Sequence, residues 1–547
     1  MCGIAGYIGK KIISDKNINH CIKTMSSRGP DANSYNRFVF GDTYYCLLHS
    51  RLSIIDLDLR SNQPFTFENL CIIFNGEIYN YIELKGELIK NGYFFQTNSD
   101  TEVLIKAFHF WGDKMYNRLE GMWAFAIYNK NTGELILSRD RFAEKPLFYF
   151  EDTDGIYFAS EVKSIFALLG KKLKINYNQI NRYLVNGYKS LYKKKETFFK
   201  NLKELDFSSY LIFNSNILKK EVCYWKLRSN INSRMNFSEA AEEVRELLIN
   251  SVKLRLRSDV PLAFCLSGGV DSSSLVSIAA KELNYNVSTF SIIDNDERYN
   301  EFENIRSTIQ DIGCDHKLVY LDPKQDMMNE LKNLITYRNS PVSTISYLIH
   351  SLLSKQISKK GYKVSISGTA ADELFTGYYD HFNLQLYGLF GTLFYKKKLS
   401  EWNKHIKPLV RNPYLQDPEL YIKNSFSRNH IFFNNIEFEK FLVNDFHEDF
   451  KENEYSKNLL HNRMMNELFH EITRVILYED DSNSMMNSIE NRSPYLDKNL
   501  AEFAYTIPNE LLIDKGYGKK ILRDAMKGIL NDKVRLDRHK KGFNASI

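Results

Sequence analysis

The chain has 547 residues, of which 43% are hydrophobic and 26% charged, and its 73 basic and 67 acidic side chains give a formal net charge of +6. This composition is typical of a soluble globular protein, and it excludes a wholly disordered chain, a collagen and a coiled-coil rod. The length predicts two to four domains. The excess of basic residues is too small for a nucleic-acid-binding domain, so we expect no nucleic-acid partner.

The cysteines and the apolar stretches indicate a cytoplasmic protein. The seven cysteines are odd in number and none belongs to a CxxC pair, which argues against a disulfide framework and a zinc site and favours a reduced compartment. The first residues lack the basic and then apolar pattern of a signal peptide. The longest apolar stretch, 387–395, is too short to span a bilayer, so we expect no membrane insertion.

The first part of the chain, 1–215, is predicted to be a layered α+β domain. Two β-hairpins are expected, because apolar runs at 123–128 and 134–138, and at 146–150 and 156–159, flank turn sequences. A buried strand at 70–74 should end at an Asn-Gly turn. Helices are expected at 81–90 and 100–110. Strands and helices mixed in this way favour antiparallel sheets with helices packed against them.

The remainder predicts a second domain at 236–547, after a linker at 216–235. An amphipathic helix should cover 239–257, followed by a strand at 261–266, a helix at 272–283, a strand at 287–293 and a later strand at 364–366. This alternation indicates an α/β domain with a doubly wound parallel sheet. Beyond residue 380 the pattern is mainly helical.

Cys2 directly follows the initiator methionine. Removal of Met1 would place a free α-amino group and a thiol on one residue. An α-amino group has a reference pKa near 7.7–8.0, so it can accept the thiol proton at neutral pH and activate the sulfur without a histidine. Taken alone, a cysteine at the second position is usually incidental.

Six further blocks give Cys2 a context. They are Arg28 to Asp31, His49 to Asp56, Gln63 and Pro64, Phe74 to Asn80, Asp100 to Glu102, and Arg139 to Phe142. In this order, and over about residues 2–200, they resemble the glutaminase domain of amidotransferases with an amino-terminal nucleophile, in particular the asparagine synthetase family. The resemblance implies an Ntn-hydrolase fold for the first domain, with Cys2 as the nucleophile that attacks the amide of glutamine.

The same resemblance assigns the other glutamine-binding residues. The side chain of Asn75 and the backbone N–H of Gly76 would form the oxyanion hole, and both would contact glutamine. Arg51 would bind the α-carboxylate of glutamine, since its planar fork suits a carboxylate. Glu77 and Asp100 would bind the α-ammonium group. Without this resemblance, the Asn75-Gly76 dipeptide would indicate an ordinary turn. Arg51 would then be expected in a surface ion pair, and Asp100 at the cap of a helix.

An anion-binding loop is predicted between the strand at 261–266 and the helix after it, where the sequence reads Leu-Ser-Gly-Gly-Val-Asp-Ser-Ser. Backbone N–H groups at a helix N-terminus favour phosphate. The loop resembles the SGGxDS motif of ATP enzymes that release pyrophosphate and form adenylates. We therefore expect ATP as co-substrate, bound by Leu266, Ser267, Gly268, Gly269, Asp271, Ser272, Ser273, Ile292, Ser367 and Gly368.

Adenylation brings anionic groups together, so Mg²⁺ is expected at the phosphates. The resemblance implies Asp271 and Asp372 as the metal ligands. It implies Glu373 as a catalytic base near the acceptor, and Lys519 as a catalytic cation that neutralises charge on phosphate and acyl oxygen. Considered without the motifs around them, Asp372 and Glu373 would indicate a solvated acidic pair or the start of a helix. Lys519 would indicate an exposed lysine.

The sequence departs from the family pattern at three positions. Where the family usually reads SGEGxDE, Thr369 replaces the acidic residue and Ala370 a glycine, and Ala143 replaces the glycine common after Arg-Asp-Arg-Phe. Aspartate has an α-ammonium group that needs a carboxylate partner, so we expect a high apparent KM for aspartate, lowered by Thr369→Glu. The sequence stops within a block, 541–547, after which relatives usually continue, so a truncated or an unusually short C-terminus is expected.

Together these features predict a glutamine-dependent asparagine synthetase that activates aspartate as its adenylate and releases AMP and pyrophosphate. The alternative keeps the chemistry and changes the acceptor to a sugar uronic acid of surface polysaccharide synthesis. A non-catalytic homologue is disfavoured because Cys2, Asp271 and Lys519 are all present, and a tRNA-modifying enzyme because the net charge is modest. The expected partners are small-molecule substrates; the oligomeric state stays open, with a homodimer as one option.

Overall fold

Two six-stranded antiparallel sheets form the first half of the chain. The computed structural model describes residues 2–215, 217–293, 300–320, 326–431, 434–448 and 450–539. The first sheet has the strand order β10 (Leu202–Glu204), β8 (Phe148–Asp152), β9 (Gly155–Ala159), β1 (Gly3–Gly9), β3 (Thr43–Arg51) and β2 (Ala32–Phe40). The second has the order β12 (Ile217–Cys223), β11 (Ser209–Asn214), β7 (Glu134–Arg139), β6 (Gly121–Asn129), β5 (Leu70–Ile78) and β4 (Phe65–Phe67).

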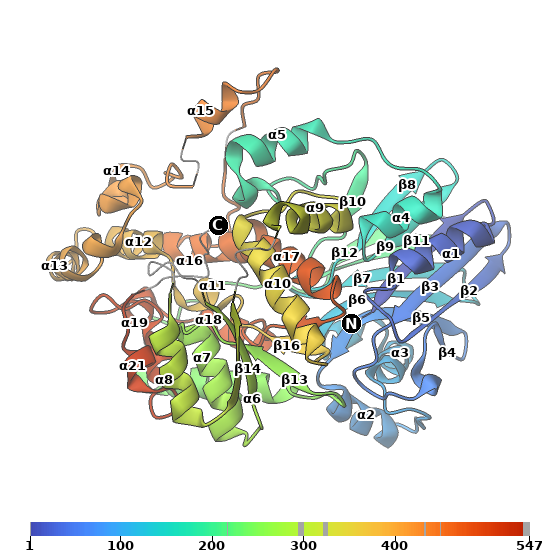
Figure 1. Ribbon diagram of the computed structural model, residues 1–547, viewed down its shortest axis with the longest axis horizontal. Coiled ribbons are helices and arrows are strands. Elements are labelled where there is room, and N and C mark those ends of the chain that lie inside the picture. The colour runs from blue at the N-terminus through green and yellow to red at the C-terminus, as the bar shows by residue number, and fades with distance from the viewer. Residues whose placement is uncertain are drawn as a thin grey trace.

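The two sheets pack face to face between two layers of helices. Successive side chains of a strand point to opposite faces. Ile4 and Ile8 of β1 therefore join the core between the sheets, whereas Ala5 and Tyr7 pack under α1 (Asp15–Thr24) and α4 (Val162–Leu169). On the far side, α2 (Tyr81–Lys90) and α3 (Asp100–Trp111) cover the second sheet. This layered α+β arrangement, blue to cyan in Figure 1, confirms the predicted class of the first domain.

The expected hairpins and helices of this half are present, but two features differ from the prediction. Strand β5 continues through Asn75 and Gly76, because both residues stay paired with β6, opposite Ala124 and Trp123. Gly76 has a φ of 154°, and a Cβ there would collide with the carbonyl oxygen of Met122. The segment 216–235, expected as linker, begins with β12, which pairs with β11 and so extends the second sheet.

The second half contains a five-stranded parallel sheet. Its order is β15 (Asp315–Tyr320), β14 (Ser288–Ile293), β13 (Leu262–Cys265), β16 (Val364–Ile366) and β17 (Glu490–Arg492). One face is covered by α6 (Phe237–Arg255), α7 (Val270–Ser277) and α8 (Phe302–Ile312), and the other by α10 (Ile345–Lys359) and α17 (Thr473–Met485). The doubly wound parallel sheet is confirmed. Strands β15 and β17 were not expected, because their sequences are mostly polar or charged.

The remaining regular elements are mainly helices (Figure 1). Within the first half lies α5 (Tyr177–Asn186). The others are α9 (Met327–Arg338), α11 (Ala371–Phe375), α12 (Tyr379–Leu389), α13 (Tyr395–His405), α14 (Leu420–Lys423), α15 (Asn435–Glu439), α16 (Leu459–Asn466), α18 (Lys498–Ala504), α19 (Asn509–Leu512), α20 (Lys520–Ala525) and α21 (Asp532–Arg535). In the described part of the chain, no helix combines the length and the apolar character needed to cross a membrane.

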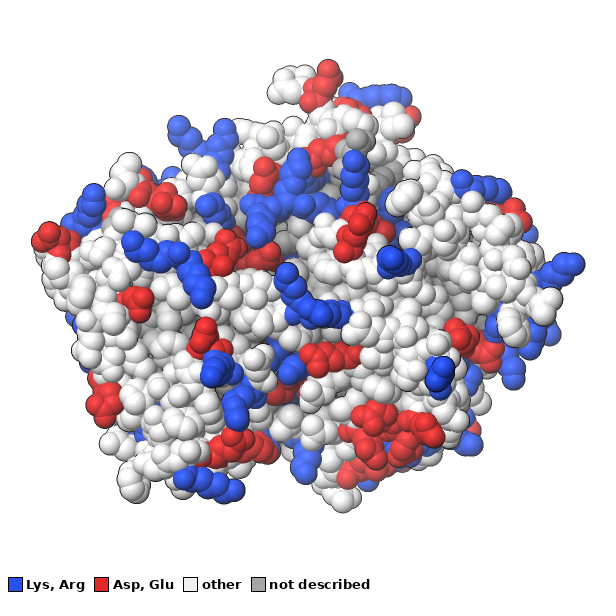
Figure 2. Space-filling view, turned by 180° about the vertical axis from the view of Figure 1, so that it is seen from behind, with Lys and Arg blue, Asp and Glu red and all other residues white. Residues whose placement is uncertain are grey.

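The two halves share a buried interface. Ile54 and Met122 of the first half pack with Leu254, Val364 and Met485 of the second in one apolar cluster. Buried ion pairs surround this cluster and join Arg28 to Asp481 at 2.7 Å and Arg255 to Glu120 at 3.0 Å. On the face that Figure 2 shows, basic and acidic side chains alternate and do not form one extended basic field.

Candidate active sites

The first candidate site surrounds Cys2, at the start of β1. The Cys2 side chain is buried, and its backbone N–H donates to Oδ1 of Asn75 at 3.1 Å. The Asn75 amide nitrogen lies 3.5 Å from the hydroxyl of Ser160, which also accepts from the N–H of Ile4. Strands β1 and β5 belong to different sheets, so the sheet packing itself brings Cys2 to Asn75 and Gly76. Met1, whose removal was expected, lies outside the described residues.

Burial dominates the electrostatics of the Cys2 thiol. It raises the pKa of Cys2, and the nearby charge of Arg51 opposes this effect. Burial also lowers the pKa of His49 to about 3, so this imidazole stays neutral at physiological pH. A neutral imidazole offers no cation to stabilise a thiolate, and an α-amino group on Cys2 itself is the better base.

Glu77 and Asp100 form a buried acidic pair at the end of β5 and the start of α3. Asp100 accepts a hydrogen bond from the N–H of Ile78 at 2.9 Å. Burial, with nearby carboxylates, raises the pKa of Asp100 to about 6 and that of Glu77 well above its ordinary value. Arg492 of β17 approaches Glu77 to 3.7 Å and contacts Glu490 at 2.7 Å. A ligand ammonium group would relieve the mutual repulsion of these carboxylates.

Arg51 has a different environment from the one expected. Its guanidinium donates to the carbonyl of Asp58 and to the side chain of Asn62, each at 2.8 Å, and to the carbonyls of Ile55 and Asp56. These bonds hold the loop between β3 and β4. Arg51 could bind a glutamine carboxylate only by sharing or exchanging some of them.

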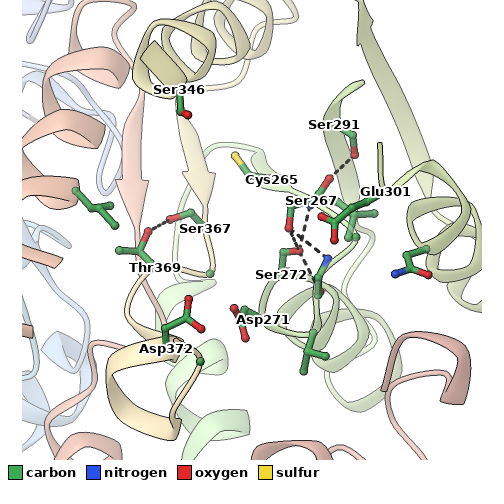
Figure 3. A pocket seen from close by; sticks show the side chains of 18 of the residues that line it. Cys265, Ser267, Asp271, Ser272, Ser291, Glu301, Ser346, Ser367, Thr369 and Asp372 are labelled. Atoms are coloured by element: carbon green, nitrogen blue, oxygen red, sulfur yellow. Dashed lines mark hydrogen bonds between the residues drawn. The ribbon is translucent and has the colours of Figure 1, made fainter. Parts of the chain in front are cut away.

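The second candidate site begins in the loop between β13 and α7. Gly268 has a φ of 89°, a conformation that favours glycine. The hydroxyl of Ser272 lies 3.0 Å from that of Ser267 and 3.1 Å from the N–H of Ser267, which fixes the loop (Figure 3). Asp271 lies in the first turn of α7. The loop thus surrounds the N-terminus of a helix, where backbone N–H groups can bind phosphate.

A second loop, after β16, forms the facing wall. Strand order reverses between β13 and β16, and ligands of doubly wound sheets bind at such a switch point. A Cβ on Gly368 would lie 3.1 Å from that of Asp271, so the two loops are in close contact. Between them is a cavity of about 580 Å³. Of the predicted ATP and metal residues, it is lined by Leu266, Ser267, Gly268, Gly269, Asp271, Ser272, Ile292, Ser367, Gly368 and Asp372.

Lys519 also lines this cavity and joins its two carboxylates. Its Nζ atom lies 2.6 Å from both carboxylate oxygens of Asp271 and 2.6 Å from Oδ1 of Asp372. Burial alone would lower the pKa of Lys519. The two carboxylates outweigh this effect and raise its pKa, so the amine stays protonated. Figure 3 shows Asp271 and Asp372 facing each other across the cavity. Two carboxylates that converge on one cation provide the oxygen ligands that Mg²⁺ prefers.

Two predicted residues lie outside the lining of the cavity. The Ser273 side chain is fully buried and lies 3.4 Å from the hydroxyl of Thr308, inside the domain. Glu373 is buried behind the wall and accepts a hydrogen bond from the hydroxyl of Tyr378 at 2.7 Å. Burial and the neighbouring Asp372 raise the pKa of Glu373 to about 7. Glu373 is thus linked to the cavity through the hydrogen bond with Tyr378, which does line it.

One functional candidate was missed by sequence reasoning. Asp480 of α17 lines the cavity, and its carboxylate lies 3.3 Å from the hydroxyl of Thr369 and 3.4 Å from Nδ1 of His350. Because 111 residues separate Thr369 from Asp480, no local pattern could pair them.

Comparison with known proteins gives two family matches. Residues 1–225 match a model described as "Glutamine amidotransferase domain", and residues 243–547 match one described as "Asparagine synthase". The chain is 31% identical to "Asparagine synthetase [glutamine-hydrolyzing] 1" of Bacillus subtilis over 100% of its own length and 87% of the relative's. It is 28% identical to "Asparagine synthetase [glutamine-hydrolyzing] 3" of the same organism (98% and 85%), and 26% identical to "Amidase chyE" of Penicillium rubens (98% and 87%).

Proposed function

Since this chain belongs to the glutamine-hydrolysing asparagine synthetase family, we propose that the carboxylate it amidates is that of aspartate. The enzyme is an ATP-dependent ligase that hydrolyses glutamine and amidates a carboxylate. The observation that carries the proposal furthest is the cluster of Asp271, Asp372 and Lys519 in the cavity at the switch point. The names of the two Bacillus relatives support aspartate as the acceptor.

In the first domain we propose that Cys2 is the nucleophile. Its α-amino group accepts the thiol proton, and the sulfur attacks the side-chain amide of glutamine. The Asn75 side chain and the N–H of Gly76 stabilise the oxyanion. Ammonia leaves, and water hydrolyses the thioester to release glutamate and restore the thiol. Glu77 and Asp100 hold the α-ammonium group of glutamine, and Arg51 its α-carboxylate.

In the second domain we propose that the loop at 266–272 binds the phosphates of ATP. Attack by the aspartate side-chain carboxylate on the α-phosphorus forms the adenylate and releases pyrophosphate. Lys519 neutralises charge that develops on the phosphate oxygens. Asp271 and Asp372 would hold Mg²⁺, which when bound supplies further charge neutralisation at the phosphates.

The amide forms when ammonia, passed internally from the first domain, attacks the adenylate and expels AMP. This step requires a proton acceptor. With a pKa of about 7, Glu373 can accept a proton near neutral pH. Since Tyr378 lines the cavity and its hydroxyl donates to Glu373, we propose that the proton travels through this hydroxyl.

An acceptor screen tests the proposal. Pyrophosphate release is measured with ATP, Mg²⁺ and glutamine, in the presence of aspartate or of uronic acid derivatives, and the amide product is identified by mass spectrometry. We expect aspartate-dependent release and asparagine as product. Release that depends on a uronic acid and not on aspartate would exclude aspartate and support the sugar carboxylate. Pyrophosphate release that no carboxylate stimulates would contradict both acceptors.

A further inference from the structure

The cavity has a polar wall opposite the loop at 266–272. Figure 3 shows Ser367, Thr369 and Asp372 on one side and Ser267 and Ser272 on the other, with Asp271 facing Asp372. Asp480 adjoins Thr369 on the first side. A ligand whose reacting carboxylate lies near Lys519 would therefore extend its other end toward Thr369 and Asp480.

The Asp480 carboxylate has few charged neighbours. Its side chain is 10% exposed, and among the residues that the structure describes His350 is the one basic side chain within ion-pair distance. Its hydrogen-bond donor is the neutral hydroxyl of Thr369. Asp271 and Asp372, at the centre of the cavity, share the single cation of Lys519 and are the proposed magnesium ligands. With those two carboxylates assigned to Lys519 and the metal, Asp480 is the carboxylate beside Thr369 that remains to bind a cationic group of the acceptor.

Asn483 adds a second, independent observation. It lies three residues after Asp480 on α17, which places both side chains on the same helical face, and it also lines the cavity. Asn483 is 1% exposed. Its amide nitrogen donates to the carbonyl of Tyr347 at 2.9 Å, which fixes the orientation of the amide, while its Oδ1 atom has no hydrogen-bond partner among the residues that the structure describes. A buried acceptor without a donor is costly unless a ligand supplies that donor.

These groups together provide acceptors to a ligand: a carboxylate, an amide oxygen and the hydroxyl oxygen of Thr369. A primary ammonium group has three N–H donors and no acceptor, so it complements this set in both charge and hydrogen bonding. A sugar hydroxyl brings one donor and no charge, and would leave the carboxylate without a cation.

We propose that Asp480 and Asn483, with Thr369 beside them, form the binding site for the ammonium group of the acceptor, which is therefore an α-amino acid. This inference rests on the proposed function, because it assumes that the acceptor occupies this cavity. It also revises the expectation drawn from Thr369: the carboxylate absent at position 369 is supplied by Asp480 from another helix.

The test compares Asp480→Asn with the wild-type enzyme. Asp480→Asn should raise the apparent KM for aspartate roughly 10- to 150-fold, since it removes a charge-assisted hydrogen bond. It should leave the KM for ATP and the glutaminase activity within a factor of about two. Ser484→Ala is the matched control, because Ser484 lines the same cavity from the same helix but is not part of the proposed site. The double variant Thr369→Glu/Asp480→Asn should recover much of the lost affinity.

Succinate, which is aspartate without its amino group, separates charge recognition from general damage to the cavity. Its inhibition constant against aspartate should be the same for the wild type and Asp480→Asn. An equal loss for succinate and aspartate would overturn the inference, as would an unchanged KM for aspartate or a rise confined to the KM for ammonia. Each of these outcomes would leave the proposed amidation of aspartate unaffected. Wild-type turnover of a uronic acid without turnover of aspartate would overturn both the inference and the proposed acceptor.

Discussion

The ammonium group of Lys519 lies 2.6 Å from both carboxylate oxygens of Asp271. Because Lys519 also contacts Asp372 at 2.6 Å, one side chain links the loop after β13 to the loop after β16. Lys519 follows Asp372, in the second of these loops, by more than 140 residues in the sequence, and its backbone φ is 55°. The same cation that joins the loops without ATP is available to neutralise phosphate charge when ATP binds.

Lys519→Met should therefore impair the ATP-dependent reaction. Removal of a charge that stabilises a transition state typically lowers the rate by about 10²- to 10³-fold, and we expect a loss of this size in pyrophosphate release. Lys520→Met is the matched control, since Lys520 pairs with Asp524 and does not line the cavity. A similar loss in both variants would show that Lys519 acts only through the local structure.

Asp271→Asn should reduce pyrophosphate release about 10²-fold or more, because it removes both a proposed magnesium ligand and a carboxylate partner of Lys519. Glutamine hydrolysis should persist, because its residues lie in the other domain. Rates are measured at saturating Mg²⁺. Normal use of ATP by this variant would rule out a role for Asp271 at the metal.

Cys2→Ala should abolish glutaminase activity and leave ammonia-dependent synthesis largely intact. The sulfur is the proposed nucleophile, while the adenylate forms in the separate cavity of the second domain. A protein that retains Met1 should behave in the same way, because it lacks the free amine on Cys2. The two activities are measured with glutamine and with ammonium chloride. Parallel loss of both in a folded Cys2→Ala protein would contradict this division, and full glutaminase activity with Met1 retained would exclude the amine as the base.

The KM for glutamine should rise as the pH falls below about 6. The pKa of Asp100 is raised to about 6, and only its ionised form attracts the α-ammonium group, so the KM should increase roughly tenfold per pH unit. The raised pKa also means that the fold loses stability as the pH rises through 6. Asp100→Asn should therefore raise the melting temperature more at pH 7.5 than at pH 5, and should weaken the pH dependence of the KM, of which Glu77 would retain a part. A flat KM between pH 5 and 7 in the wild type would contradict this assignment.

Arg492→Met should destabilise the protein by about 3–5 kcal/mol, because it leaves Glu77 and Glu490 buried without their cation. The loss is measured as a shift in the urea unfolding midpoint. Arg257→Met is the control: Arg257 pairs with the half-exposed Glu83 on the same interface, and a pair of this kind contributes about 1 kcal/mol or less. Equal losses in the two variants would exclude a special role for the buried cation.

Local sequence patterns predicted most of the framework, whereas most residues of the two candidate sites were proposed from the resemblance to a family. Alternating apolar residues indicated the hairpins, and the glycine-rich loop after β13 lies where the pattern placed it, because strand, turn and helix are adjacent in the chain. Asn75 and Gly76 were harder to interpret. The dipeptide is typical of a turn, but pairing with β6 keeps both residues extended.

Long-range contacts could not be predicted in the same way. Arg51 stays the proposed partner of the glutamine carboxylate, but no local pattern could show that its guanidinium also donates to carbonyls of the following loop. Strand β17 has the sequence Glu-Asn-Arg, which is polar enough to indicate a surface, and it is nevertheless largely buried because the charges of Glu490 and Arg492 satisfy each other. The position of Asp480 beside Thr369 depends on how α17 packs, and no local pattern encodes that packing.

Strand β17 makes the two halves of the enzyme poor candidates for exchange between relatives. The carbonyl of Arg492 accepts the N–H of Ser367 at 3.0 Å, in the wall of the ATP cavity, while its guanidinium extends to Glu77 at the glutamine site. A chimaera with a first half from another protein would have to bring an acidic residue at the position of Glu77, or the guanidinium would lose part of its charge compensation in the interior. Recombination of such halves is therefore constrained at this ion pair as well as at those of Arg28 and Arg255, and natural variation at positions 77 and 492 should be correlated.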